Sequence, residues 1–358
     1  GQSRLDYPLI DGVQKGCPHH ILEPARTNSI QYSEDFSQWT TAALTITNNN
    51  AISPTGNLNA DLVTADGTNN QHYVLQVQSS SAKTMSIFAK AGTHQFIQIL
   101  TSGTATPVAN YDLINGTTNL VGSSSTPSIE NYGNGWYRCI LSTTDVAAGS
   151  FYVCFSNSLS SSRFPSILSS GTIYLWGAQS EANASYATSY IPTTSTAVTR
   201  SAETASGAGN STTFNDSEGV LMAEISSEDD GSTKIISIAN SSGNENTVWI
   251  GYDNGVYFII RSDGVTQLNG SVIPIQSNEI TKCAILYSNV NVKLYVNGFN
   301  LFEYTNITMP IGLNQLTFSR KGGSLPFYGN TKQIQYFDSA LDSQQLEQLT
   351  SWQSFRDM

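Results

Sequence analysis

The side chains that could carry out hydrolysis are sparse in this sequence and form no known catalytic motif. A hydrolase needs a nucleophile with a base, or a pair of carboxylates. The chain has neither a Gly-x-Ser-x-Gly elbow nor a His-Glu-x-x-His motif. Of its four histidines, His19 and His20 are adjacent, so in an extended chain they point to opposite faces and make a poor metal pair. We therefore predict no enzyme, although a carboxylate pair distant in sequence stays open.

Aromatic rings are the remaining candidates for ligand binding. Aromatic residues make up 10% of the chain and charged residues only 12%, about half the usual share. Sugars present C–H faces that stack on Trp and Tyr, while Asn, Gln and Ser bond the hydroxyl groups. The candidate ligand-binding residues are Trp39, Tyr73, Trp176, Tyr186, Trp249, Tyr252 and Tyr257. For each ring, core packing is the alternative, and we expect it for Trp136 and Phe151, which lie in mid-strand apolar runs.

The charge balance excludes two classes of partner. The net charge of −11 and the absence of a Lys/Arg cluster argue against nucleic acid and against anionic lipid. No apolar run approaches the roughly 18 residues of a membrane span. We therefore expect no nucleic acid partner and no membrane insertion.

The four cysteines, Cys17, Cys139, Cys154 and Cys283, are too scattered for a disulfide framework or a zinc site. Cys139 and Cys154 lie on consecutive apolar runs joined by a turn near Val146. A symmetric hairpin would place them opposite each other. Two buried thiols are the expectation, and a cross-strand disulfide is the alternative.

The pattern of short alternating runs predicts an all-β protein. From about residue 32 to 192, runs such as Thr84–Lys90 and Trp136–Ile140 alternate and are separated by Gly, Pro and Asn turns. This spacing is typical of a sandwich or jelly roll. Residues 1–31 are interrupted by prolines and are expected to form an extended lead-in. Residues 193–217 lack apolar periodicity and are expected to be a linker.

Residues 218–358 are expected to form a second β-sandwich. Thr247–Tyr252 and Val256–Arg261 predict a hairpin around Asp253-Asn254-Gly255. One short helix is expected near the end of the chain. Asp342 and Gln345 are spaced as a capping box, and apolar residues follow at helical spacing.

Several segments resemble a known family. Arg4-Leu5-Asp6-Tyr7, the stretch Glu23–Asn28, and the runs Asn131–Arg138 and Trp176–Gln179 resemble bacteriophage tail-fibre and virion appendage proteins. There these segments accompany jelly rolls similar to carbohydrate-binding modules. Tyr295–Gly298 and the Phe337–Leu341 turn resemble marks of concanavalin A-like, laminin-G or pentraxin-type domains. The resemblance implies a jelly roll over residues 32–192 and a concanavalin A-like domain over 218–358.

The resemblance also implies a function. It points to a non-enzymatic virion protein that is assembled in the host cytoplasm and binds cell-surface glycans, in contact with other virion proteins. A homo-oligomer, with a trimer favoured, would supply avidity. Two alternatives stay open: a structural capsid-decoration or tail component, and a glycan-binding region of a larger polysaccharide-degrading enzyme. Glu23, Arg26 and Asn28 are interpreted as residues that dock the lead-in.

Structural calcium is the one cofactor for which the sequence offers candidate ligands. Glu228, Asp229 and Asp230 form the densest acidic run, and calcium takes oxygen ligands from such loops. The resemblance adds Glu34, Asp35 and Glu181, because related jelly rolls hold calcium where the first and last strands meet. A solvated turn is the alternative for the acidic run.

Overall fold

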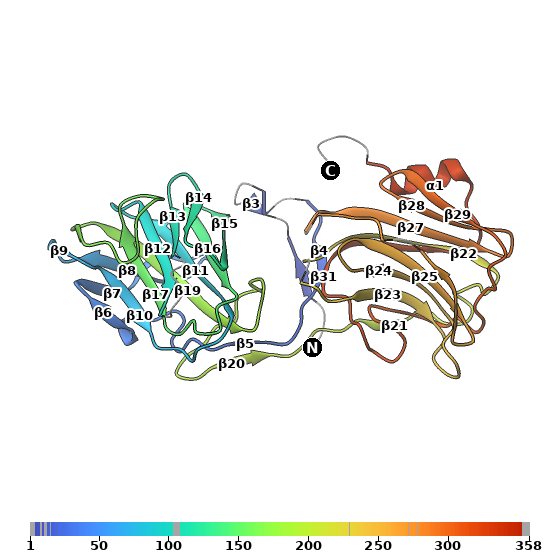
Figure 1. Cartoon of the computed structure of the whole chain (residues 1–358), viewed down its shortest axis with the longest axis horizontal. Helices are drawn as coiled ribbons and strands as arrows, with labels where there is room; N and C mark the ends of the chain where they lie inside the picture. The colour runs from blue at the N-terminus through green and yellow to red at the C-terminus, as the bar shows by residue number, and fades with distance from the viewer. Residues whose placement is uncertain are drawn as a thin grey trace. The chain divides into compact units, whose positions relative to one another are not determined.

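The computed structural model describes residues 4–7, 9–10, 13–14, 16–102, 108–228, 230–270, 272–276 and 278–352. Within them the chain forms two compact all-β units, visible in Figure 1. The first module comprises residues 9–15 and 25–201, and the second module comprises residues 1–8, 16–24 and 202–358. Along the chain, the first module is therefore inserted into the second.

The first module is a sandwich of two six-stranded antiparallel sheets. The β12 sheet has the order β14 (Thr117–Val121), β13 (Val108–Asp112), β12 (Phe96–Thr101), β17 (Phe151–Ser156), β10 (Tyr73–Gln76) and β6 (Thr40–Ala42). The β11 sheet has the order β15 (Ser125–Gly133), β16 (Trp136–Thr143), β11 (Lys83–Ala91), β19 (Thr172–Ala182), β8 (Leu58–Ala65) and β7 (Leu44–Ile52). Smaller elements are the 3-10 turn η1 (Phe36–Gln38), the ribbon of β9 (Asn69–Asn70) with β18 (Ile167–Leu168), and the ribbon of β2 (Leu9–Ile10) with β3 (Val13–Gln14).

Strand alternation sorts the side chains of the first module between its core and its outer faces. On β11, Ile87 and Ala89 are fully buried in the core between the sheets. Phe88, which lies between them in sequence, belongs to a separate aromatic cluster with Trp136 and Trp176. Because successive side chains of a strand point to opposite faces, this cluster lies on the outer face of the β11 sheet.

The second module is also a two-sheet sandwich. The β22 sheet has the order β1 (Arg4–Asp6), β4 (His19–Leu22), β31 (Gly329–Phe337), β22 (Glu218–Ser226), β27 (Thr281–Ser288), β28 (Val292–Val296) and β29 (Phe299–Tyr304). The β24 sheet has the order β21 (Ser206–Ala208), β30 (Gln315–Thr317), β23 (Lys234–Ala239), β24 (Thr247–Tyr252), β25 (Val256–Ser262) and β26 (Val265–Asn269). The expected hairpin is confirmed as the pair β24 and β25.

The expected helix is α1 (Ser343–Thr350). Asp342 accepts from the Gln345 backbone N–H, and Gln345 accepts from the Asp342 N–H, which completes the predicted capping box. Leu346 is fully buried against the outer face of the β22 sheet. Within the described part of the chain, no helix is long and apolar enough to cross a membrane.

The structure divides the chain differently from the expected lead-in and linker. Strand β4 lies within residues 1–31, yet it pairs with β31 and carries β1 at the edge of the β22 sheet. The next strand, β5 (Arg26–Asn28), pairs with β20 (Val198–Arg200) inside the expected linker. Asn28 is fully buried and donates to the carbonyls of Ala178 and Ile191. These segments are therefore paired parts of the two modules.

The expected hairpin between the Cys139 and Cys154 strands was wrong. Cys139 lies on β16 of the β11 sheet, whereas Cys154 lies on β17 of the β12 sheet. The turn near Val146 crosses between the two layers of the sandwich, so the thiols are not cross-strand neighbours. Both are free and buried, and burial raises the pKa of each thiol above its ordinary value.

Candidate functional site: a hollow over Trp136

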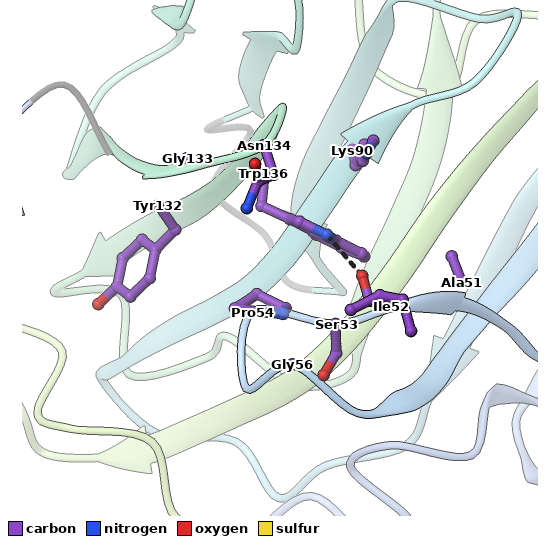
Figure 2. Close-up of a pocket in the computed structure, with 10 residues that line it drawn as sticks. All are labelled: Ala51, Ile52, Ser53, Pro54, Gly56, Lys90, Tyr132, Gly133, Asn134 and Trp136. Carbon is purple, nitrogen blue, oxygen red and sulfur yellow. Dashed lines mark hydrogen bonds between the residues drawn. The ribbon is translucent and has the colours of Figure 1, made fainter. Parts of the chain in front are cut away.

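A hollow of about 340 Å³ lies on the outer face of the β11 sheet, around Trp136 (Figure 2). One side comes from the end of β7 and the following turn, residues 51–56. The other side comes from residues 132–136, where β15 turns into β16, and Lys90 of β11 completes the lining. Small-ligand pockets span roughly 300–1,000 Å³, so this hollow suits a ligand of one or two sugar residues.

Trp136 forms a fixed floor for the hollow. Its side chain is 2% exposed, and its Nε1 donates to the Ile52 carbonyl at 3.0 Å, the dashed line in Figure 2. Phe88 and Trp176 pack in the same cluster, with ring centroids 5.1 Å apart. Because the indole is held by a hydrogen bond and by its neighbours, the floor needs little reordering when a ligand binds.

A β-bulge places Tyr132 at one side of the hollow. Asn131 pairs with Tyr137 and Gly133 pairs with Trp136, so Tyr132 is the extra residue of β15. A bulge re-aims the side chain that it carries. The Tyr132 ring meets Phe88 edge-on at 4.8 Å, and it is half-buried.

The turn that follows Tyr132 depends on its residue types. Gly133, Asn134 and Gly135 have φ values of 78°, 53° and 78°. Glycine adopts this left-handed region freely, and Asn is among the few other residues that tolerate it. The turn leaves the Asn134 side chain exposed at the hollow, where its amide can meet a hydroxyl group.

The lining combines apolar surface with few polar groups. In Figure 2, Trp136 lies between Tyr132 on one side and Lys90 on the other, with Pro54 of the β7–β8 turn below. Ile52, at the edge of that turn, is 56% exposed. Lys90 is the single charged residue of the lining, which contains no carboxylate, histidine or cysteine. Such a surface can bind a sugar, but these side chains supply no acid, base or nucleophile pair.

Four of the aromatic residues predicted to bind ligand are buried, and this prediction is corrected for them. Their exposed fractions are 5% for Trp39, 2% for Trp176, 4% for Trp249 and 1% for Tyr252. Trp39 packs on Phe36 and Phe151 in the core of the first module, as expected for Phe151. Arg320 covers the ring of Trp249 at 5.6 Å. These rings contribute packing area and offer no free face for stacking.

Tyr73 lies on the outer face of the β12 sheet, under a segment that we call the strap, residues 157–166. Gln98 donates to the Ser162 carbonyl and accepts from the Phe164 N–H, each at 3.0 Å. Asn110 donates to the Ser161 carbonyl at 3.0 Å. The Phe164 ring then contacts Tyr73 edge-on at 5.8 Å. The strap therefore occupies the face on which Tyr73 was expected to meet a ligand.

Tyr186 and Tyr257 are half-buried, but neither lines the hollow over Trp136. The Arg26 guanidinium lies over the Tyr186 ring at 5.8 Å, which fits the interpretation of Arg26 as a docking residue. The Tyr257 ring lies against Gly251, where a Cβ atom would come within 2.2 Å of it. The absence of a side chain at Gly251 therefore leaves the space that the Tyr257 ring occupies on the β24 sheet.

The carboxylates expected near the ends of the first module have other partners. Glu34 accepts from Asn59 Nδ2 at 2.8 Å and from the Tyr190 hydroxyl at 3.1 Å. Asp35 accepts from the Ser37 N–H at the start of η1. Glu181 is fully buried and accepts from the Thr188 N–H at 3.0 Å. In the described residues no three His, Cys, Asp or Glu side chains are grouped to hold a metal.

A lysine lies within the acidic run of the second module. Lys234 Nζ donates to Asp230 Oδ1 at 2.6 Å and to the Glu228 carbonyl at 2.7 Å. Burial alone would raise the pKa of Asp230, but its bonds to Lys234 and Ser232 lower it. The ammonium supplies the positive charge that calcium was expected to supply. Asp229 lies outside the described residues.

A second hollow, of about 330 Å³, lies in the second module between the segment before β21 and the loop after β30. Its lining is uncharged and includes Ser206, Gln315 and Thr317, with Phe318 as its one aromatic residue. It offers hydroxyl and amide groups, but it has neither an aromatic floor nor a cation. The hollow over Trp136 is therefore the stronger candidate.

Sequence reasoning missed the residues that form the hollow. Trp136 was expected to pack in the core; it is buried, but in the outer-face cluster with Phe88 and Trp176. Tyr132, Asn134 and Lys90 were not proposed as site residues. The available signal was the run Tyr132-Gly133-Asn134-Gly135-Trp136, in which a left-handed turn separates two aromatic residues. That turn predicts that the strand ends there, but it does not reveal which loop faces it.

The sequence and the fold can be compared with those of known proteins. No protein-family model and no curated protein matches the chain. The CBM40 module of the Ruminococcus gnavus IT-sialidase is similar over 41% of this chain and 95% of its own, with 16% identity and a TM-score of 0.35. Domain 4 of an extracellular arabinanase from Geobacillus stearothermophilus, in complex with arabinotriose, covers 44% and 73%, with 18% identity and a TM-score of 0.32.

The mouse laminin α1 chain, domains LG4-5, is similar over 77% of this chain and 90% of its own, with 9% identity and a TM-score of 0.28. By its own strands, the described part of the chain is all-β, with antiparallel sandwiches and one short C-terminal helix. It has distant structural similarity to carbohydrate-binding modules and to laminin G domains. At these TM-scores the similarity carries no argument about a ligand, which has to be argued from the hollow itself.

Proposed function

We propose that this chain is a non-enzymatic glycan-binding protein and that the hollow over Trp136 is its binding site. The observation that carries the proposal is the hollow itself, in which half-buried Tyr132 and Pro54 and exposed Ile52 present apolar surface beside Asn134, above the buried indole of Trp136. The apolar surface of Tyr132, Pro54 and Ile52 suits the C–H faces of a sugar, and the Asn134 amide suits its hydroxyl groups. The lining holds no acid–base pair, which supports binding without hydrolysis.

We further propose that the protein belongs to a virion appendage such as a phage tail fibre, where it contacts glycans on the host cell surface. This part rests on the resemblance of Arg4–Tyr7, Glu23–Asn28 and Asn131–Arg138 to such proteins. One small hollow buries little area, so binding to a cell needs several copies. A homo-oligomer, with a trimer favoured, would provide that avidity.

The direct test is a glycan microarray probed with the intact protein and two variants. Tyr132→Ala removes one wall of the hollow and is expected to weaken binding by about tenfold or more, since an aromatic contact of this kind contributes on the order of 1–3 kcal/mol. Phe299→Ala is the matched control, because Phe299 is 69% exposed on β29 of the second module. It should leave binding unchanged.

The results separate the proposal from its rivals. Loss of binding in Tyr132→Ala alone supports the hollow as the site. Equal binding by all three proteins would place the glycan site elsewhere. If the intact oligomer binds no glycan and no host surface, the proposal fails in favour of a structural role in the particle. Release of reducing sugar by the purified chain would show that it is an enzyme.

A further inference from the structure

We propose that the hollow over Trp136 selects glycans that carry a carboxylate, and that Lys90 is the residue that pairs with this group. The inference rests on the proposed function, because it assigns the class of ligand for the same hollow. It concerns the carboxylate shared by uronic and sialic acid sugars, and the experiment distinguishes the two.

Among the lysines that the structure describes, Lys90 is the one for which no hydrogen bond or ion pair is found. The structure describes seven lysines, and six of them donate a hydrogen bond or form an ion pair: Lys83, Lys234, Lys282, Lys293, Lys321 and Lys332. Lys90 has neither among the described residues. Even the buried Lys83 reaches the Ser79 carbonyl at 2.7 Å. The one described lysine without a partner is therefore the lysine that lines the hollow.

The position of Lys90 is fixed by the sheet. It pairs with Trp136 on β16 and with Tyr174 on β19, so it lies in a central strand. Its neighbour Ala89 points into the core and is fully buried. Alternation along the strand then directs Lys90 to the outer face, beside the indole floor.

The stem of Lys90 is supported by the turn after Tyr132. A Cβ atom at Gly135 would lie 3.4 Å from Lys90 Cε, so the turn packs closely against the side chain. Lysine stems commonly pack along apolar surface while the ammonium stays near water. Lys90 is half-buried and lines the hollow, and its ammonium has no acceptor among the described residues. A carboxylate bound in the hollow would give this ammonium a charge-assisted hydrogen bond.

The surrounding charges make the choice of ligand selective. The lining contains no carboxylate that would repel an anion. The whole chain, however, carries a net charge of −11, which disfavours non-specific binding of anionic polymers. Preference for an acidic glycan therefore depends on the local cation, and a single substitution should remove it.

The experiment compares matched pairs of acidic and neutral ligands by titration calorimetry. One arm uses trigalacturonic acid and its methyl ester, and the other uses sialyllactose and lactose. The intact protein is expected to bind at least one acidic ligand about tenfold or more tightly than its neutral counterpart, the range for one charge-assisted hydrogen bond. The arm that shows this difference identifies the source of the carboxylate.

Three variants assign the preference to Lys90. Lys90→Met keeps the apolar stem and should lower affinity for the acidic ligand to about that of the neutral one. Lys90→Arg should retain the preference. Lys293→Gln is the control for net charge, because Lys293 lies near Glu303 on the second module at 3.9 Å, a weak surface pair.

The outcomes distinguish this inference from the proposed function. If wild-type protein binds neutral and acidic ligands equally and Lys90→Met changes nothing, the inference is wrong and glycan binding stands. If Tyr132→Ala abolishes binding while the acidic preference survives in Lys90→Met, the cation is elsewhere and the inference is also wrong. Absence of binding to every ligand in the intact protein overturns the proposed function itself.

Discussion

Arg4 and Glu203 are 199 residues apart in the sequence, yet the Arg4 guanidinium donates through Nε to the Glu203 carboxylate. The same guanidinium also bonds Glu23 on its Nη2 side. The two carboxylate side chains are only 10% and 4% exposed, for Glu23 and Glu203 respectively. The Glu23 N–H donates to Glu203 Oε2 at 2.8 Å, which completes the cluster. One arginine on the edge strand β1 thus compensates two carboxylates of the second module, Glu23 near the end of residues 16–24 and Glu203 near the start of residues 202–358.

Replacing Arg4 with Met should destabilise the second module. The substitution leaves two buried carboxylates side by side, and an uncompensated buried charge costs roughly 3–5 kcal/mol. Arg4 itself is 40% exposed, so solvent reduces the loss to about 1–3 kcal/mol. The loss in free energy of unfolding can be measured by urea unfolding followed by circular dichroism. The double variant Arg4→Met/Glu203→Gln should recover part of the loss, and full additivity of the two substitutions would contradict the proposed coupling.

A fragment of residues 202–358 should not fold as a stable unit. It lacks β4, which pairs with β31, and it leaves the buried Glu203 without Arg4. A chain that joins residues 1–24 to residues 202–358 through a short flexible linker restores both and should unfold cooperatively. Thermal melts of the two proteins make the comparison. A cooperative melt of the 202–358 fragment equal to that of the joined chain would show that β1 and β4 are dispensable.

Residues 25–201 should fold alone. Their two ends are paired with each other as β5 and β20, with Thr27 opposite Thr199. The core of the first module draws its residues from this segment. Its melting temperature should match the corresponding transition of the whole chain. A version that stops at residue 195 loses β20, and it should melt at a lower temperature because β5 then has an open edge.

The stability of the second module should fall in acid through Glu245. Burial alone would raise the pKa of Glu245, but Arg320, bound at 2.7–2.8 Å, together with Arg261 and Lys321 lowers it. A carboxyl whose pKa is lower in the folded state stabilises the fold above its unfolded pKa, 4.5. That stabilisation is lost as the pH falls through the lowered pKa that Glu245 has in the folded protein. The free energy of unfolding, measured in urea, should therefore decline less from pH 7 to pH 3 for Glu245→Gln than for wild type.

Removing the Gln98 amide should loosen the strap. Gln98 is fully buried, and Gln98→Leu leaves the Phe164 N–H and the Ser162 carbonyl without their partner. An orphaned buried group costs about 1–3 kcal/mol. Hydrogen exchange should rise in residues 157–166. Asn119→Ala is the control, since Asn119 is exposed and bonds only the far end of the strap at Leu159. If the two substitutions raised hydrogen exchange in the strap equally, burial of the Gln98 amide would not be the cause of its protection.

The strand pattern of this protein was readable from the sequence because it is local. Alternation identified β11, β16 and β24, and the spacing of Asp342 and Gln345 identified α1. Module membership was not readable for β4, since its partner β31 lies more than 300 residues away. Nothing in the short run His19–Leu22 indicates which distant strand it pairs with.

The candidate site was harder to predict than the fold, for a physical reason. An aromatic residue on a strand can face the core, an open surface or a covering segment, and the sequence alone does not separate these cases. Trp176 faces outward but is covered by its neighbours, and Tyr73 is covered by the strap. The hollow depends on the contact between Trp136 and the Ile52 carbonyl, which joins turns 84 residues apart.

The pairing of β5 with β20 has a genetic consequence. It brings residues 25 and 201, the two ends of the inserted segment, to one place, so the coding region between them behaves as a cassette. Exchange of that cassette would carry the whole Trp136 hollow to a new background and leave the framework of β1, β4 and residues 202–358 uninterrupted. A lineage could thereby replace its recognition surface in a single recombination event, with both crossover points beside one short ribbon.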